Sequence, residues 1–502
     1  MAVPIDYHAI LPELILSGTI VLVLVADTFL APRHAWWSMP LSLVGVAAAL
    51  GAALTLIGDQ RTTFGGMFVV DGFALLFKVF FLSVAAIVLM VSLRYFRDGR
   101  WYQGEYYFLL LTSFLGCVLM PSSRDLLMLF ISLELVSAPG FMIAAFRKTD
   151  PRSNEAGIKF FLIGVLSSAV MLYGMSLIYG VTGETNLVTI GEALGRTAVT
   201  QSGVGTSSTL VLERGSEALV LVAILFIVAG FAFKVSAVPF QFWAPDTYEG
   251  APVPVAAFLA TASKAAGFAG LLQLMFVAFQ GQWEFWTPIF AALSIATMTI
   301  GNLVALQQNQ IVRLLAYSSI AQAGYMLLPF ALVSGDAEVN DSAFAAAVTY
   351  ILIYAVMNLG AFGVVIAVAR ESASLLISDF AGLVRRAPVL AMAMTVFMVS
   401  LAGIPPTGGF WAKFLVFRAA IERGGIGTAL AAIMVVNSVI SLYYYLAVPR
   451  SMVFVDPVVE RPLASPVLVN AVVAVAMVAI LVIGFYPELF AYFPPRATLV
   501  AP

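Results

Sequence analysis

The chain has 502 residues, of which 62% are hydrophobic and only 10% are charged, and its mean hydropathy is +1.00. This composition excludes an ordinary soluble globular protein and indicates a membrane protein. Acidic and basic residues nearly balance to a net charge of −2, and no basic stripe runs along the chain, so nothing indicates a nucleic-acid partner.

Long apolar stretches follow one another along the whole chain. A helix needs about 20 apolar residues to cross the hydrocarbon layer of a bilayer. The sequence therefore predicts an all-α polytopic protein with about fourteen transmembrane helices in a single transmembrane domain, 1–502. The predicted segments lie roughly at 9–30, 40–58, 71–93, 107–120, 125–146, 158–180, 217–238, 254–279, 286–306, 314–334, 343–369, 389–417, 427–448 and 466–490. No basic region with a cleavage site opens the chain, so we expect the first segment to be retained.

Basic residues in the loops predict the orientation of these helices. The loops after the odd-numbered segments carry about thirteen Lys and Arg residues, and the opposite loops and the termini carry about seven. Basic loops tend to stay in the cytoplasm. We therefore expect both termini on the outer side of a bacterial plasma membrane.

Three pairs of similar stretches occur in the same order in two parts of the chain. The pairs are LELVSAPGFMI from Leu133 with YSSIAQAGYML from Tyr317, AVMLYG from Ala169 with AVMNLG from Ala355, and VPFQFW ending at Trp243 with IPPTGGFW ending at Trp411. The copies are five segments apart, and an odd offset turns the second copy upside down in the membrane, as in many transporters. We predict N-terminal helices 1–3 in 1–106, five-helix repeats in 107–280 and 286–448, the second inverted, and helix 14 in 449–502.

A few charged residues lie inside segments that otherwise avoid charge. Ionised side chains at bilayer depth cost several kcal/mol on insertion scales, so they usually face an interior path and serve a function. One carboxylate and several lysines in such positions predict a route for protons or cations. The candidate site residues are Glu134, Lys159, Lys234, Lys264 and Lys413.

Two of these lysines lie beside proline-containing breaks. Lys234 precedes Pro239 in segment 7, and Lys413 follows Pro405-Pro406 in segment 12. Proline has no amide hydrogen and displaces the carbonyl four residues back, so we predict that helices 7 and 12 are broken. Such breaks must be buried or hydrated. The alternative is an ordinary proline kink with a lysine that snorkels to the surface.

The other candidates differ in depth. Lys264 lies about ten residues inside segment 8 among small residues, which let helices approach closely. Glu134 lies well inside segment 5, where a contact with Lys234 would keep both groups ionised; the alternative is a static pair that only fixes packing. Lys159 stands near a segment boundary, where anchoring to lipid headgroups explains it equally well. Lys78, outside both predicted repeats, is interpreted as a packing residue.

Residues that hold metals or cofactors are scarce. The one cysteine, Cys117, can form neither an internal disulfide nor an iron–sulfur cluster on its own. The two histidines, His8 and His34, lie outside the predicted core. No dinucleotide fingerprint is present either. We therefore expect no metal and no cofactor bound by this chain.

Several of these stretches together resemble a known family. The motifs LELVSAPG, NEAGIKFFLIG, KVSAVPFQFWAPDTYEGAPVPV, ATASKAAGF, GNLVALQQNQIVRLLAYSSIAQAGYM and LAGIPPTGGFWAKF span roughly residues 125–420. They resemble the antiporter-like subunits of respiratory complex I and of multisubunit cation/proton antiporters. Pro12-Glu13-Leu14 and the lysine at position 413 make the chain most similar to the N-subunit (mitochondrial chain 2) branch.

The resemblance implies a proton-translocating membrane-arm subunit of an NADH–quinone oxidoreductase. It implies Glu134 and Lys234 as a gating pair, Lys264 as the central relay, Lys413 as the terminal lysine and a less defined role for Lys159. It also implies a hetero-oligomer with other membrane-arm and peripheral subunits, in contact with lipid. NAD, FMN, iron–sulfur and quinone sites would lie in those partners. One departure is Gln322, where the family often has histidine, so a relay there would need water.

Two alternatives remain open at this point. The chain could belong to a cation/proton antiporter without redox chemistry, or it could be a structural membrane subunit with no ion path. The first predicts sodium-dependent exchange and no peripheral iron–sulfur subunits. The second predicts that replacing the interior charges leaves pumping unchanged.

Overall fold

The structure is a computed structural model that describes residues 5–29, 36–98, 103–200, 214–372, 374–457 and 460–488. Nearly all of these residues are helical. The N-terminal helices are α1 (Leu11–Phe29), α2 (Ser38–Leu54), α3 (Gly72–Asp98), α4 (Gln103–Leu119), α5 (Leu126–Ala144), α6 (Pro151–Thr182), α7 (Leu187–Thr200), α8 (Arg214–Val235) and α9 (Trp243–Gly250). The C-terminal helices are α10 (Val253–Phe258), α11 (Lys264–Gln273), α12 (Trp283–Ala305), α13 (Ile311–Leu327), α14 (Ala337–Val368), α15 (Leu383–Arg386), α16 (Pro388–Ala402), α17 (Gly408–Arg423), α18 (Ile426–Phe454) and α19 (Val467–Phe485).

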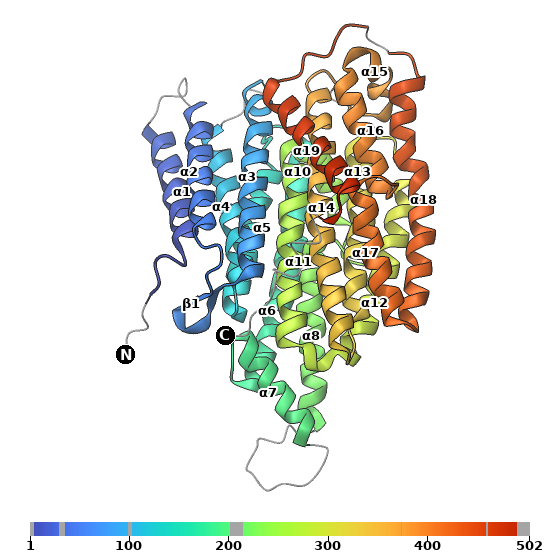
Figure 1. Cartoon of the computed structure of the whole chain (residues 1–502). Helices are drawn as coiled ribbons and strands as arrows, with labels where there is room; N and C mark the ends of the chain where they lie inside the picture. The colour runs from blue at the N-terminus through green and yellow to red at the C-terminus, as the bar shows by residue number, and fades with distance from the viewer. Residues whose placement is uncertain are drawn as a thin grey trace.

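The helices form one bundle along which most of them follow the order of the chain, but the last helix, α19, returns to the middle beside α14 (Figure 1). Helices α1 to α5 lie at one end, α8, α10 and α11 lie in the middle, and α16 to α18 lie at the other end (Figure 1). Within the described residues, twelve helical stretches are long and apolar enough to cross a membrane. Adding the shorter helix α2 and the broken pair α16–α17 gives every predicted segment a helical counterpart. The prediction of an all-helical polytopic membrane protein is confirmed.

Two small elements were not predicted from the sequence. Strands β1 (Arg61–Thr63) and β2 (Phe68–Val70) pair antiparallel, with Arg61 opposite Val70, and Phe68 and Val70 form a small buried cluster with Ala9 and Leu56. Helix α7 projects from the bundle at the bottom of the view in Figure 1. It buries Leu187, Ile190 and Leu194, whose spacing of three and four residues gives one apolar face. Both elements are too short to cross a membrane, so the length of apolar stretches in the sequence does not indicate them.

Both predicted helix breaks are present. Segment 7 ends as α8 at Val235, and the chain becomes helical again only at α9. Segment 12 is divided into α16 and α17 by residues 403–407. Each break contains a cis X–Pro bond, at Val238–Pro239 and at Pro405–Pro406. The prediction that helices 7 and 12 are interrupted is confirmed.

The centre of the bundle is densely buried. Every residue from 253 to 275 is buried, and α14 is almost as enclosed, whereas α6 leaves one apolar face uncovered. That face includes Ile158, Phe161, Leu162, Val165 and Leu166, which suits contact with lipid or another apolar surface. A charged side chain on α11 therefore lies in the protein interior and cannot reach lipid.

Candidate functional site

Lys234 lies at the end of α8, immediately before the first break. Its side chain is only 2% exposed. Ser236 has a positive φ of 61°, which turns the chain out of the helix. The carbonyl of Phe233, beside the lysine, accepts a hydrogen bond of 3.1 Å from Trp243 Nε1 at the start of α9. The break thus supplies partners for its own backbone and keeps the lysine inside.

The partner of Lys234 is a serine. Lys234 Nζ donates a hydrogen bond of 2.9 Å to Ser137 Oγ on α5. Glu134 lies one turn earlier on α5, is partly exposed, and accepts a hydrogen bond of 2.5 Å from Ser168 Oγ on α6. The direct Glu134–Lys234 contact expected from the sequence is therefore absent in this structure. The two groups lie on neighbouring turns of the same helix surface, but each has its own hydroxyl partner.

Lys264 occupies the middle of the bundle. Its Nζ donates hydrogen bonds to the carbonyl oxygen of Ser319 at 2.8 Å and to Ser319 Oγ at 3.0 Å, both on α13. A π-helical turn, Leu259–Ser263, directly precedes it. Such turns are frequent at functional sites because they redirect side chains within a continuous helix. The expectation that Lys264 faces the interior is confirmed by its 1% exposure.

Small residues bring Lys264 and Lys234 into one neighbourhood. Gly267 lies one turn after Lys264, and a Cβ added there would meet Lys234 Cγ at 3.0 Å. The glycine therefore lets α11 pack directly on the stem of Lys234. The sequence ATASKAAGF, which is rich in small residues, makes this close approach possible.

Lys413 lies on α17, beyond the second break. Its Nζ donates a hydrogen bond of 2.9 Å to the carbonyl oxygen of Ala402, the last residue of α16, and lies 4.6 Å from the centre of the Tyr325 ring. Carbonyls at a helix C-terminus lack intrahelical partners and carry partial negative charge. Here the residues four positions after Leu401 and Ala402 are Pro405 and Pro406, which have no amide hydrogen to offer.

None of these three interior lysines forms an ion pair within the part of the chain that the structure describes. Each ammonium group donates to hydroxyl or carbonyl oxygens, and that of Lys413 also faces the Tyr325 ring. A buried charge without a counterion is costly, so its protonation depends strongly on nearby charges. Three such groups in one bundle suit the stepwise gain and loss of protons.

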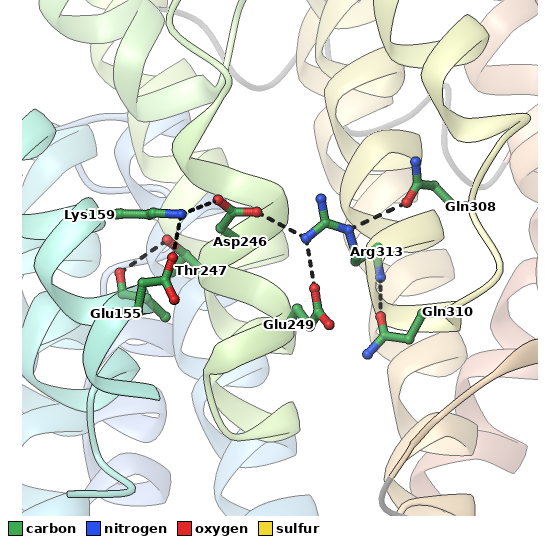
Figure 2. Close-up of polar contacts among 9 residues, drawn as sticks. Glu155, Lys159, Asp246, Thr247, Glu249, Gln308, Gln310 and Arg313 are labelled. Carbon is green, nitrogen blue, oxygen red and sulfur yellow. Dashed lines mark hydrogen bonds and ion pairs between the residues drawn. The ribbon is translucent and has the colours of Figure 1, made fainter. Parts of the chain in front are cut away.

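Lys159 belongs to a different arrangement, an ionic network that joins α6, α9 and α13 (Figure 2). Its Nζ lies 2.7 Å from both Glu155 Oε1 on α6 and Asp246 Oδ2 on α9. Asp246 Oδ1 in turn lies 2.9 Å from Arg313 on α13, which also pairs with Glu249 at 2.7 Å. Lys159 is 44% exposed and is therefore not one of the interior lysines. Its partners show that headgroup anchoring is not needed to explain it.

Asp246 is the shared member of that network. Partial burial alone would raise the pKa of the Asp246 carboxyl, but hydrogen bonds from Lys159 and Arg313 outweigh burial and hold the pKa below its ordinary value. Helix α9 directly follows the break beside Lys234, and α13 carries the partner of Lys264. The network thus ties the broken helix of the first half to a helix of the second half.

The N-terminal helices contain buried charges of their own. Lys78 Nζ lies 2.7 Å from Glu13 Oε1, and both side chains are at least 93% buried. Arg124 pairs with Asp71 at 2.5 Å and also bonds to Gln273 at the end of α11. Lys78 was interpreted from sequence as a packing residue, and its pairing between α3 and α1 agrees with that interpretation.

Reading the sequence alone missed the polar partners of the lysines. Ser137 and Ser319 were not singled out, because serines in apolar helices give no periodic signal. Arg313, which reaches Lys159 only through Asp246, was not singled out either. The sequence does indicate that the carbonyls of Leu401 and Ala402 have no helical amide partner, since each precedes a proline by four residues.

An all-helical membrane bundle, with unpaired lysines at interruptions of its helices, defines an antiporter-like membrane subunit. The family described as "NADH:quinone oxidoreductase/Mrp antiporter, TM" matches residues 123–441. The chain is 40% identical to NADH-quinone oxidoreductase subunit N of Trichlorobacter lovleyi, covering 98% of this chain and 97% of that protein. It is also 40% identical to NAD(P)H-quinone oxidoreductase subunit 2 of Synechocystis, covering 91% of this chain and 84% of that one. The chain belongs to the NADH-quinone oxidoreductase subunit N family.

Solved structures agree with this assignment. A chain of respiratory complex I from Thermus thermophilus is 31% identical, with a TM-score of 0.77 over 97% of this chain and 99% of that chain. A chain of the Mrp complex from Dietzia is 20% identical, with a TM-score of 0.81 over 98% of this chain and 97% of that chain. At that identity the second likeness shows only a shared fold.

Proposed function

We propose that this chain moves protons across the membrane through Lys234, Lys264 and Lys413, with Glu134 and Lys159 acting on them from the first half of the bundle. The chain is an integral membrane subunit of NADH-quinone oxidoreductase and works in a hetero-oligomer with the other subunits of that complex. Quinone reduction in partner subunits would supply the energy.

One observation carries the proposal. Lys234, Lys264 and Lys413 are buried, have no carboxylate partner among the described residues, and each lies beside a break or a π turn. Nearby charges change the energy of a buried ammonium strongly, because the surroundings screen poorly. A charge change at one lysine would therefore influence proton uptake or release at the next.

Several finer features belong to the same proposal. The breaks at 236–242 and 403–407, each with a lysine nearby, support inverted repeats within 107–280 and 286–448. The distribution of basic loop residues supports both termini on the outer side. We expect NAD, FMN, iron–sulfur clusters and quinone to be bound by partner subunits, because this chain offers no cysteine set or nucleotide motif for them.

The two alternatives have less support. An antiporter without redox chemistry is represented by the Mrp complex, to which the likeness is of fold alone. A purely structural subunit would have no use for three interior lysines without counterions, since apolar residues would pack there at lower cost.

The test is proton pumping by membrane vesicles that carry the assembled complex. Lys234→Ala, Lys264→Ala and Lys413→Ala should each sharply reduce protons moved per NADH oxidised. Lys148→Ala, at a lysine that is 71% exposed, is the matched control and should pump normally. Normal pumping by all three interior variants at equal complex abundance would contradict the proposal.

A further inference from the structure

A cluster of uncharged polar side chains lies between Lys264 and Lys413. It brings together four helices: α13 supplies Ser318 and Gln322, α14 supplies Tyr350, α16 supplies the carbonyl of Leu401, and α18 supplies Tyr445. All four side chains are at most 1% exposed. Buried polar groups need partners, so the hydrogen bonds of such a cluster are strongly defined.

Gln322 is the centre of the cluster. Its Nε2 lies 3.0 Å from the carbonyl oxygen of Leu401 and 3.0 Å from the hydroxyl of Tyr445, while its Oε1 lies 2.5 Å from the hydroxyl of Tyr350. Both amide hydrogens are therefore used, and the amide oxygen has a partner too.

The carbonyl of Leu401 determines which way the amide faces. A backbone carbonyl oxygen can only accept a hydrogen bond, so the Gln322 atom beside it must be the NH₂ group. Turning the amide by 180° would place two acceptors against each other. The orientation of Gln322 thus follows from the chemistry of its neighbour.

This orientation gives direction to the adjacent hydroxyl groups. Tyr350 must donate its proton, because it faces the amide oxygen. Tyr445 accepts from the Gln322 NH₂ group, which has no acceptor capacity, so the Tyr445 proton points elsewhere. Two hydroxyls lie beside Tyr445: Ser318 Oγ, which is at hydrogen-bond distance (2.5 Å), and that of Tyr444, whose own proton goes to Asn302 Oδ1. Ser318 is the one of the two that is well placed to accept. Tyr445 therefore directs its proton toward Ser318.

Two members of the cluster, Leu401 and Ser318, are each followed directly in the chain by a residue that binds a lysine. Leu401 holds Gln322, and the next carbonyl, that of Ala402, holds Lys413 Nζ at 2.9 Å. Ser318 holds Tyr445, and the next residue, Ser319, holds Lys264. A movement of the break at 403–407 would shift both carbonyls together and so alter the hold on Gln322.

We propose that Gln322 is a positioning residue that couples Lys413 to Lys264. Consecutive carbonyls at the end of α16 bind the Lys413 ammonium and the Gln322 amide, and the amide fixes the Tyr445 hydroxyl toward Ser318, beside the partner of Lys264. A glutamine does not exchange protons near neutral pH, so Gln322 transmits the state of the break without carrying a proton itself. This inference rests on the proposed function of the two lysines.

The test compares pumping by membrane vesicles for Gln322→Leu, Tyr445→Phe and the double variant, at equal complex abundance. Each single variant should lower protons moved per NADH oxidised about three- to tenfold, the effect of losing a buried hydrogen bond. The double variant should pump no worse than the poorer single variant, because both break the same connection. Tyr106→Phe removes another buried tyrosine hydroxyl bonded to a serine, Ser92, and should pump normally.

A conservative variant and a pH profile separate coupling from packing. Gln322→His keeps donor and acceptor nitrogens, so it should restore most of the pumping lost in Gln322→Leu. It should also add a pH dependence near about pH 6.5, the ordinary pKa of imidazole. Wild-type pumping in Gln322→Leu, additive losses in the double variant, or no recovery of pumping in Gln322→His would each overturn the inference.

Lys413→Ala in the same series keeps the two proposals distinguishable. If Lys413→Ala loses pumping while Gln322→Leu does not, only the coupling role of Gln322 is wrong. If both variants pump like wild type, the proposed proton route through Lys413 is wrong as well.

Discussion

The Lys413 ammonium group lies 2.9 Å from the carbonyl oxygen of Ala402, which ends the helix on the other side of the break. The lysine on α17 thus stabilises the C-terminus of α16 across five non-helical residues. Lys234 has a different arrangement, since its ammonium bonds to a serine hydroxyl on α5. A hydroxyl can rotate and can donate as well as accept, whereas a backbone carbonyl only accepts. The two lysines beside the breaks therefore have unequal partners.

The contact between Gly403 and Lys413 gives the first prediction. Gly403 has a φ of 89°, and a Cβ added there would lie 2.7 Å from Lys413 Cδ. Gly403→Ala should therefore add the cost of a left-handed alanine, about 1–2 kcal/mol, and also displace the lysine from Ala402. We expect pumping per NADH oxidised to fall at least about threefold.

Gly58→Ala is the matched control for this change. Gly58 has the same φ of 89° but no atom within 4 Å of an added Cβ. This variant measures the cost of placing alanine in the left-handed conformation at a position that does not contact a lysine. Equal pumping defects in the two variants would show that backbone strain, rather than displacement of Lys413, causes the effect.

The second prediction concerns the partner of Lys234. Ser137→Ala removes the hydroxyl that accepts from Lys234 Nζ, and hydrogen bonds to charged groups contribute about 1.5–3 kcal/mol. We expect pumping to fall about tenfold or more in membrane vesicles, with normal assembly. Ser132→Ala, at a buried serine of the same helix whose hydroxyl bonds to Ser123, should leave pumping unchanged. If both variants behave alike, Ser137 matters only for packing.

Most of the fold could be predicted from the sequence because hydrocarbon thickness determines the length of a membrane helix. The breaks at Pro239 and at Pro405-Pro406 were predictable for a chemical reason, the missing proline amide hydrogen. The π turn before Lys264 was not predictable, since residues Leu259–Ser263 have no feature that distinguishes them from an ordinary helical turn. The amphipathic helix α7 was overlooked because its 14 residues are too few to cross a membrane.

The burial of the candidate lysines Lys234, Lys264 and Lys413 could be predicted from the sequence, but their bonding partners could not. Interior charge is visible in the sequence because it contrasts with apolar neighbours, so Lys234, Lys264 and Lys413 stood out. Which groups they contact depends on helix rotation and packing, which a single sequence does not determine. In this structure Glu134 and Lys234 bond to separate serines, Ser168 and Ser137, so the role of the two as a pair stays a prediction.

The third prediction uses the pH dependence of the Asp246 network. The folded structure holds the pKa of Asp246 below its ordinary value, so the network stabilises the fold above the unfolded pKa of about 3.9. That stabilisation is lost as the pH falls through the lower folded pKa. The difference in thermal stability between wild type and Asp246→Asn should be constant from about pH 6 to 8 and shrink below about pH 4.

The size of this effect should be modest. The side chains of Lys159, Asp246 and Arg313 are 44%, 36% and 28% exposed, so water and salt screen their interaction. We expect a stabilisation on the order of 1 kcal/mol or less, which added salt weakens further. The measurement is the temperature at which the solubilised complex releases this subunit. Asp456→Asn, at an aspartate that is 85% exposed, should cause no shift.

The fourth prediction concerns the buried pair Glu13–Lys78, which joins α1 to α3. Removing one partner leaves the other charge buried and unpaired, which costs about 3–5 kcal/mol. Glu13→Gln should therefore lower the amount of the subunit in the membrane, as measured by immunoblotting. Because the pair lies outside the proposed proton route, the complexes that do assemble should pump normally. The double variant Glu13→Gln/Lys78→Met removes both charges and should recover part of the lost abundance. Normal abundance of Glu13→Gln with reduced pumping per complex would instead place this pair within the proton route.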